Sequence, residues 1–487
     1  MQAVVKATNI RRSLFKPLPV SAQIGSGFFY GRCAVEYQEF LANKVRNDTA
    51  NGFTPIWLPD TLFPFQKTLV SWAIRQGRAA LLEDCGMGKS LQELVWSENV
   101  VRHTNKPVLL ATPLAVGSQM CEEGNKFGID CERSRDGEIS GQSRVVVTNY
   151  EQLHKFNPSD FGGFCGDESS CVKNSKSETK KVVGEFCRTI PYRLLATATA
   201  APNDYHELGT SSDVLGYLGY QDMITKFFKQ DTVKDFRGWG RAKYRFRGHS
   251  KTHFWQWVCS WARAVRKPSD IGGDDSQFNL PPLVKSEHVV TTAKTRDGLL
   301  FAMPATTLQE QREERRNSLD ERCDKAAELA MSHEGACVLW CDLNEEGRRL
   351  TSLIPGAVEL SGSTSEARKE EILTAFTAGE IQRLVTKPKL GCWGLNWQHC
   401  HKTIMFPTHS FEQTYQAIRR FWRFGQKHPV ELDVVVNEGE LGVLKNLERK
   451  SKQADEMFDS LVAHMNNAIS IERGDTFETK EEVPSWL

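Results

Sequence analysis

The segment from Leu81 to Ser90, Leu-Leu-Glu-Asp-Cys-Gly-Met-Gly-Lys-Ser, carries the residue types that bind phosphate groups. Gly86 and Gly88 allow successive backbone N–H groups to turn inward on a polyphosphate. A helix that begins at Lys89 adds the positive end of its dipole, and the lysine side chain reaches the outer phosphates. Ser90 is then placed to ligate Mg²⁺. The chemistry indicated is the binding of a nucleoside triphosphate.

Two details qualify this motif. Glu83 stands where the strict pattern G-x-x-x-x-G-K-[ST] has its first glycine. Met87 separates the two glycines and is counted with the phosphate-binding loop. On this motif alone, a chance Gly-Lys-Ser turn is an equal alternative, so the remaining residues decide the interpretation.

Asp167 and Glu168 form the second pair with chemical potential. An aspartate at the end of a strand can hold Mg²⁺, and the adjacent glutamate can orient and deprotonate the water that attacks the terminal phosphate. The preceding residues 164–166 predict only a weak strand. A surface Asp-Glu pair is the alternative, and it is the commoner one when such a pair stands alone.

Further polar side chains stand at the predicted ends of elements. Gln66 is at a helix start, where its amide can pair with both edges of adenine or simply begin the helix. Thr197 and Thr199 follow the apolar run Tyr192 to Ala196 and are plausible relays between a nucleotide site and a second domain.

Arg420 and Arg423 lie in the segment 416–426, which also contains Gln416. If this segment is helical, a spacing of three places both arginines on one face. Two guanidinium groups presented together can neutralise the charge that develops on a transferring phosphoryl group. Such a role requires that they act across a cleft on the phosphate loop.

The elements that must position these residues alternate between strands and helices. Apolar strands are predicted at 79–82, 108–111 (before Thr112) and 145–147. Strands that are apolar throughout, with helices between them, indicate a parallel sheet covered on both faces, whose ligands gather at the carboxyl ends of the strands. A second alternation between 336 and 436 predicts a second α/β domain.

The segment 222–268 is rich in both basic and aromatic residues. Basic side chains among aromatic ones suit a surface that follows a nucleic-acid backbone, and Arg241, Lys243 and Arg245 are candidate contacts, as is Thr112. The alternative is a helical insertion with an aromatic core and a solvated basic face. The two interpretations are compatible.

Composition places bounds on the class of protein. The 487 residues suffice for roughly three domains, and 40% hydrophobic with 25% charged residues is ordinary for a globular chain. The net charge of +1 means that a polyanion must be held by local patches. No apolar run approaches the roughly 20 residues of a membrane helix, so we expect no membrane association.

Thirteen cysteines occur without a C-x-x-C pair. Cys121, Cys131, Cys165 and Cys171 come closest to a cluster, but their spacing fits no zinc template. Reduced thiols without a metal are the expectation.

The order of these motifs resembles that of superfamily-two helicases, and most closely that of SWI/SNF-like DNA translocase ATPases and the compact DEAD/DEAH-type helicases of bacteriophages. The motifs that carry the resemblance are Gln66, Gly86 to Ser90, Thr112-Pro113, Thr148 to Glu151, Asp167-Glu168, Thr197 to Thr199, Gly391 to Asn396 and Gln416 to Gln426.

The resemblance implies a role for each matching residue. Gln66 would read adenine, Gly86 to Ser90 would bind the phosphates of ATP, and Ser90 with Asp167 would hold Mg²⁺. Glu168 would be the catalytic base. Thr197, Thr199 and Gln416 would couple the nucleotide state to motion, and Arg420 and Arg423 would act as arginine fingers.

Three residues depart from the family's usual pattern. Ser170 and Trp422 each stand where the family often has histidine, and Cys165-Gly166 replaces an apolar strand end. None of these removes a group needed directly for hydrolysis.

Together these observations predict an α/β protein with two RecA-like parallel-sheet lobes, a basic, aromatic-rich helical insertion and a helical C-terminal tail. The expected boundaries are an N-terminal accessory segment (1–60), lobe 1 (61–215), the insertion and linker (216–282), lobe 2 (283–437) and the tail (438–487).

The expected function is an ATP-dependent helicase or translocase that moves along duplex DNA in the cytoplasm, or in the host cytoplasm if a phage encodes it. The alternatives are an RNA-directed helicase of the same superfamily and an ATP-gated DNA-binding protein that does not cycle. Because a switch that does not cycle needs neither Glu168 nor the two arginines, the last alternative is disfavoured.

Overall fold

The computed structural model describes residues 52–114, 116–140, 144–234, 240–292, 308–391 and 396–473. The described residues belong to one compact unit. Nearly all of the expected accessory segment 1–60 lies outside the described residues, as do the central residues of the motif 391–396. The side chains of Arg241 and Lys243 are also outside the description.

The first lobe is built on a seven-stranded sheet whose paired strands all run parallel. Five central strands are buried along almost their whole length, which is the burial expected of a parallel sheet covered on both faces. In spatial order the strands are β3 (Cys131–Arg133), β4 (Val145–Asn149), β2 (Val108–Thr112), β5 (Gly163–Gly166), β6 (Tyr192–Thr197), β1 (Arg78–Glu83) and β9 (Ala262–Val265).

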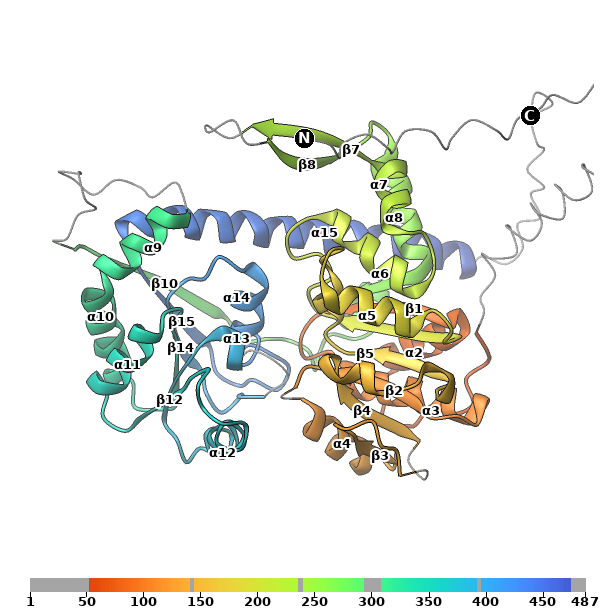
Figure 1. Cartoon of the computed structure of the whole chain (residues 1–487), viewed down its shortest axis with the longest axis horizontal. Helices are drawn as coiled ribbons and strands as arrows, with labels where there is room; N and C mark the ends of the chain where they lie inside the picture. Colours follow the sequence, from red (N-terminus) through yellow and green to blue (C-terminus); the bar gives the residue numbers. More distant parts are fainter. Residues whose placement is uncertain are drawn as a thin grey trace, which may run out of the picture. The chain divides into compact units, whose positions relative to one another are not determined.

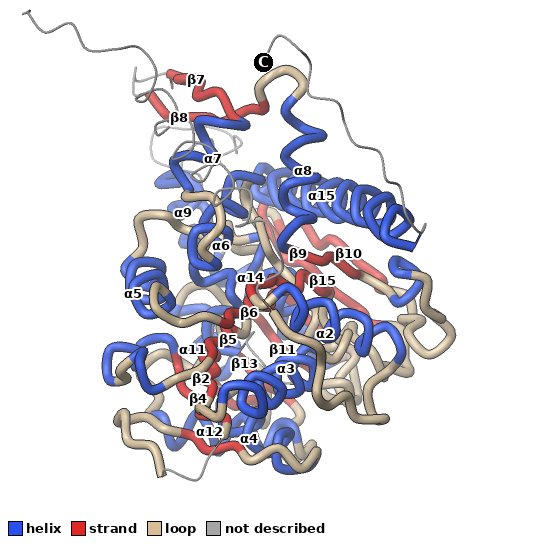
Figure 2. Tube along the Cα trace, turned by 90° about the vertical axis from the view of Figure 1, so that its right-hand side faces the viewer, coloured by secondary structure: helices blue, strands red, loops and turns tan. Residues whose placement is uncertain are grey.

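Helices connect the strands of this sheet and pack on it, and the turned view shows β4, β2, β5 and β6 side by side among them (Figure 2). The helices are α2 (Pro64–Gln76), α3 (Lys89–Thr104), α4 (Gly117–Lys126), α5 (Glu178–Cys187) and α6 (Leu208–Leu215). Short 3-10 helices occupy Tyr150–Lys155, Pro158–Asp160, Ser169–Val172, Tyr205–Glu207 and Pro268–Ile271. Because all strand pairs are parallel, the strands all end at the same edge of the sheet, and the loops after β1, β2, β5 and β6 bring the predicted polar residues to that edge.

The second lobe has a six-stranded sheet, also parallel in every pair. Its spatial order is β10 (Leu283–Val290), β15 (Val430–Asn437), β14 (Lys402–Met405), β11 (Cys337–Trp340), β13 (Arg383–Thr386) and β12 (Ala357–Leu360). Its helices are α9 (Leu308–Asn317), α10 (Leu319–Met331), α11 (Asn344–Leu353), α12 (Glu366–Thr377), α13 (Pro388–Gly391) and α14 (Phe411–Ile418).

The basic, aromatic-rich segment contains the helices α7 (Tyr220–Phe227) and α8 (Ser250–Trp261). It also contains an antiparallel hairpin of β7 (Phe228–Lys234) and β8 (Gly240–Phe246), which both views draw at the end of α7 (Figures 1 and 2). Stacked and edge-on rings of Phe228, Phe246 and Phe254 join the hairpin to α8. The aromatic residues of this segment thus form its core, as one of the two sequence interpretations expected.

The C-terminal part is the single long helix α15 (Leu441–Arg473), preceded by the short 3-10 turn Glu438–Glu440 (Figure 1). Leu444 belongs to the core of the second lobe, whereas Met457 and Leu461 belong to the core of the first. The predicted fold class is therefore confirmed: two parallel-sheet α/β lobes, an inserted basic and aromatic segment, and a helical tail. Among the described residues, no helix combines the length and apolar character needed to cross a membrane.

Candidate active site

The phosphate-loop segment lies between β1 and α3, and α3 begins at Lys89 as the sequence predicts. Gly86 and Gly88 have φ angles of 88° and 78°, in the left-handed region that favours glycine. A Cβ on Gly86 would lie 2.8 Å from the backbone nitrogen of Phe424, and a Cβ on Gly88 would clash with the side-chain amide of Gln66. Both glycines are therefore required by backbone conformation and by close neighbours.

Lys89 lies at the base of this loop. Its Nζ donates hydrogen bonds to the carbonyl oxygens of Glu83 (2.9 Å) and Asp84 (3.0 Å). Burial alone would lower the pKa of Lys89, but Cys85, Glu168 and other acidic neighbours raise it overall, so the ammonium stays charged. A fixed, charged ammonium at the start of a helix that follows a glycine loop is a complement to a phosphate chain.

Gln66 is buried near the start of α2, next to the same loop. Its Nε2 donates to the carbonyl of Met87 (2.8 Å), and its Oε1 accepts from the backbone of Phe63 (2.9 Å). An amide has two donors and two acceptor sites, so one of each remains for a ligand. The rings of Phe63, Phe278 and Phe424 contact one another close by, with Phe278 stacked on Phe424 at 4.7 Å between centroids.

Asp167 follows the last residue of β5, at the sheet edge where the phosphate loop also lies. Its backbone N–H continues the strand pairing to the carbonyl of Ala111 (2.9 Å), and its carbonyl accepts from the hydroxyl of Tyr150 (2.7 Å). Burial, together with the negative charge of Glu168, raises the pKa of Asp167 to about 7. Lys89 and Arg420 act in the opposite direction. A bound cation would favour the ionised form of this carboxyl.

Glu168 has a left-handed backbone, with φ of 46°, which is uncommon for a residue with a side chain. Its Oε2 accepts hydrogen bonds from Thr197 Oγ1 (3.4 Å) and from Gln416 Nε2 (3.3 Å). Ser170 donates a hydrogen bond to the backbone carbonyl of Glu168 (3.5 Å). The carboxylate is thus held by one residue from each lobe.

The second lobe reaches the site through the segment after α14. This helix ends at Ile418, so Arg420 and Arg423 lie in turns, and the expectation that they share a helix face is wrong. Their charges nevertheless act at the site. Arg420 lowers the pKa of Asp167, and burial followed by the charge of Arg420 lowers the pKa of Arg423.

Sequence reasoning missed the arginine that pairs directly with the phosphate loop. Arg419 forms a buried ion pair with Asp84, and the hydroxyl of Tyr415 donates to the same carboxylate. Cys85 also contacts Gln416, at 3.7 Å between sulfur and oxygen. Asp84 lies within the predicted phosphate-loop segment 81–90, and Arg419 lies within the segment 416–426. The sequence therefore located both charges but did not predict that they pair.

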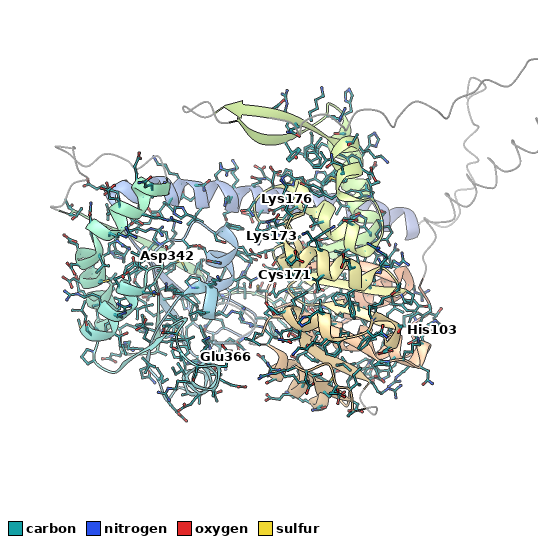
Figure 3. All side chains as sticks on the ribbon, viewed as in Figure 1. His103, Cys171, Lys173, Lys176, Asp342 and Glu366 are labelled. Atoms are coloured by element: carbon teal, nitrogen blue, oxygen red, sulfur yellow. The ribbon has the colours of Figure 1, made fainter. Side chains whose placement is uncertain are left out.

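Thr199 takes part in another contact with the second lobe. Its backbone N–H donates to Thr197 Oγ1 (3.0 Å), and its hydroxyl contacts Glu412 Oε1 at 3.4 Å. Glu412 also forms an ion pair with Lys173, which follows the turn that contains Cys171 (Figure 3). The two threonines therefore connect Glu168 on one side to α14 on the other.

A set of buried polar groups behind the loop was also missed. Glu83 is the last residue of β1, and its Oε2 accepts from Gln92 (2.8 Å), while burial raises its pKa to about 7. Both carboxyl oxygens of Glu93 lack a hydrogen-bond partner within the described part of the chain, and burial followed by Asp167 raises its pKa well above the usual value. Glu83 occupies a strand position, so it does not interfere with the loop's shape.

The candidate nucleic-acid contacts lie apart from these residues. Thr112 is buried, and its hydroxyl contacts the carbonyls of Pro113 (3.1 Å) and Thr148 (3.4 Å). Arg245 is exposed on the hairpin and pairs with Asp231 across it, at 2.5 Å between Nε and Oδ2. Arg241 and Lys243 belong to the same strand β8.

The residues at the sheet edge fit a nucleotide with Mg²⁺. Mg²⁺ in such sites is held by one or two protein oxygens together with phosphates and waters, which makes the Ser90 hydroxyl and the Asp167 carboxyl candidate ligands. In the described part of the chain, no group of three or more His, Cys, Asp or Glu side chains could hold a metal by itself. The two glycines with positive φ and the fixed Lys89 are the candidate cradle for the phosphates.

No protein-family model matches the chain, and no curated protein matches it. Among solved structures, the Sulfolobus solfataricus SWI2/SNF2 ATPase core in complex with dsDNA is similar over 86% of this chain and 98% of that chain. The identity is 15% and the TM-score is 0.40. That likeness describes a neighbour and assigns no activity to this chain.

Proposed function

We propose that the chain is an ATP-dependent DNA helicase or translocase, which couples ATP hydrolysis to movement along duplex DNA. The observation that carries the proposal is the position of Glu168. Its carboxylate lies at the phosphate-loop edge of the first sheet and accepts hydrogen bonds from Thr197 of the first lobe and Gln416 of the second. A base held by both lobes is sensitive to any change in their separation.

In the proposed reaction, Lys89 and the amides of Gly86 to Gly88 bind the phosphates, and Gln66 pairs with adenine through its remaining donor and acceptor. Mg²⁺ bound by Ser90 and Asp167 would neutralise phosphate charge. Glu168 orients the attacking water and accepts its proton, and Arg420 and Arg423 stabilise the charge on the transferring group.

Coupling follows from the contacts that cross between the lobes. Arg419 and Tyr415 bind Asp84 in the phosphate loop, and Glu412 contacts Thr199 after β6. Because these partners belong to the loops that would surround ATP, hydrolysis and release change the contacts that hold the second lobe. The motif resemblance supports duplex DNA as the track, with the exposed basic hairpin around Arg245 as a contact and the cytoplasm as the location.

The test is steady-state ATP hydrolysis in the presence of duplex DNA by the wild-type chain and by Glu168→Gln. The expected result is a loss of turnover of about 10²- to 10⁴-fold, with nucleotide binding retained, because the amide keeps the shape of the side chain but accepts no proton. Glu345→Gln, at an exposed position outside the site, is the matched control and keeps wild-type turnover. Unchanged hydrolysis by Glu168→Gln would remove the assigned base.

A further inference from the structure

A recess lies at the edge of the first sheet opposite the phosphate loop, where β1 and β6 begin. Its cavity of about 510 Å³ is bordered by α5, α6 and the first residues of these two strands. Five cationic side chains line it, Arg78, Lys180, Lys181, Arg188 and Arg193, against only two carboxylates, Glu185 and Asp213. The recess is therefore strongly positive in a chain whose net charge is only +1.

Two of the cations are forced close together by the sheet. Arg78 and Arg193 are register partners in neighbouring parallel strands. Their Nη1 atoms lie 3.1 Å and 2.7 Å from the point that a Cβ of Gly216 would occupy, so they are at most 5.8 Å apart. Like charges opposed on neighbouring strands are unfavourable. Burial, and then the charge of Arg78, lowers the pKa of Arg193 to about 10.

Backbone carbonyls explain the position of Arg193 but not the whole cluster. Its three nitrogens donate to the carbonyls of Ile190 (2.9 Å), Val214 (2.9 Å) and Arg188 (3.2 Å), which close the ends of α5 and α6. This capping role needs one arginine. It does not account for Arg78 beside it or for the side chain of Arg188, which line the same recess.

The remaining contacts leave charge available to a ligand. Lys180 forms an ion pair with Asp213, and Lys181 forms one with Glu178. The three arginines of the recess are therefore its cations without a carboxylate partner among the described residues. Arg78 uses Nε for the carbonyl of Pro191 (3.1 Å), and its Nη1 faces the space above Gly216. Gly216 has φ of 84°, and any side chain there would meet both guanidinium groups. The glycine therefore keeps the space over the two arginines open.

We propose that this recess is a binding site for a polyphosphate anion, such as pyrophosphate, tripolyphosphate or the phosphate chain of a nucleotide. The excess of three positive side chains suits a ligand with two or more negative charges, and guanidinium groups bind phosphate oxygens in pairs. The volume falls within the range of small-molecule sites, about 300–1,000 Å³, and exceeds what one phosphate ion fills. The site is separate from the proposed ATP site because it lies at the opposite ends of β1 and β6.

The experiment is isothermal titration of the full chain with tripolyphosphate, without Mg²⁺ and at low ionic strength, in a Lys89→Ala background that weakens the phosphate loop. Arg188→Ala is added as the test because this arginine is exposed, so we expect its removal to leave the fold intact. Lys176→Ala removes an exposed cation outside the recess and is the matched control (Figure 3).

The expected result is binding by Lys89→Ala that weakens about tenfold or more with Arg188→Ala and is unchanged with Lys176→Ala. A competition titration with ATP then compares the affinities of the nucleotide and of free tripolyphosphate for the recess. The tighter ligand identifies the source of the phosphate chain. Absence of tripolyphosphate binding, or binding indifferent to Arg188→Ala, would overturn the proposal. So would displacement of tripolyphosphate by a short DNA duplex at lower concentration, because the recess would then hold a nucleic-acid backbone.

Discussion

Glu83→Gln should stabilise the protein at alkaline pH and have a much smaller effect at acid pH. Glu83 is completely buried at the end of β1, and burial raises its pKa from 4.5 to about 7. Gln92 is the hydrogen-bond partner of its Oε2, and its Oε1 has none among the described residues. An uncharged amide of the same shape removes the cost of burying a carboxylate.

The sign and the size of the pH-dependent change in the free energy of unfolding follow from proton linkage. Between about pH 4.5 and pH 7, folded Glu83 keeps a proton that the unfolded chain releases, so the free energy of unfolding falls as the pH rises. The stabilising contribution is complete below pH 4.5 and lost above pH 7. A change of roughly 2.5 pKa units corresponds to about 3 kcal/mol. Glutamine does not titrate, so the difference between Glu83→Gln and wild type should grow by most of that amount between pH 5 and pH 8.

The assay is urea unfolding at pH 5 and pH 8, followed by tryptophan fluorescence and analysed by linear extrapolation. Comparing variant and wild type at each pH cancels the titration of the groups that do not interact with Glu83. Glu345→Gln makes the same change of charge at an exposed position and should show no such growth. A Glu83→Gln difference that is equal at the two pH values would refute the reasoning.

Two further substitutions test the loop and its partner in the second lobe. Gly88→Ala should abolish nucleotide binding in a fluorescence titration, because a Cβ at this position meets the side chain of Gln66. Gly128 has a similar φ of 74° and nothing within 4 Å of its Cβ position, so the control Gly128→Ala should bind nucleotide normally. Equal binding by the two variants would contradict the steric argument. Arg419→Met leaves the carboxylate of Asp84 buried without its cation, so it should lower the free energy of unfolding by about 3–5 kcal/mol. Adding Asp84→Asn to this variant should restore part of the lost stability. If the double variant is less stable than Arg419→Met alone, the pairing is contradicted.

Much of the fold was predictable because most strands of the first sheet are continuous apolar runs in the sequence. The apolar runs at 79–82 and 108–111 predicted β1 and β2 within one residue at each end, and the glycine loop correctly located the start of α3 at Lys89. The strand β9 was missed, since its four residues are flanked by tryptophan and arginine and show no alternation. The hairpin of β7 and β8 was missed, because the basic and aromatic residues of this segment predicted a helical insertion.

The parts of the site that lie within one segment of the sequence were predictable. The contacts between two distant segments were not. The glycines and Lys89 are close in sequence, and their geometry follows from the strand-to-helix turn. The pairing of Asp84 with Arg419, and not with Arg420, depends on α14 ending at Ile418, and neither glycine nor proline marks that end in the sequence. The burial of Glu83 similarly depends on its being the last strand residue instead of the first loop residue.

The central claim is that ATP hydrolysis at the Lys89 loop is coupled to duplex DNA. The most direct measurement is steady-state ATP hydrolysis without nucleic acid and with single-stranded DNA, duplex DNA or duplex RNA, for the wild-type chain and Lys89→Ala. We expect strong stimulation by duplex DNA that Lys89→Ala abolishes. Stimulation by RNA alone would favour an RNA-directed helicase, and binding of ATP and DNA without any turnover would contradict the proposed motor.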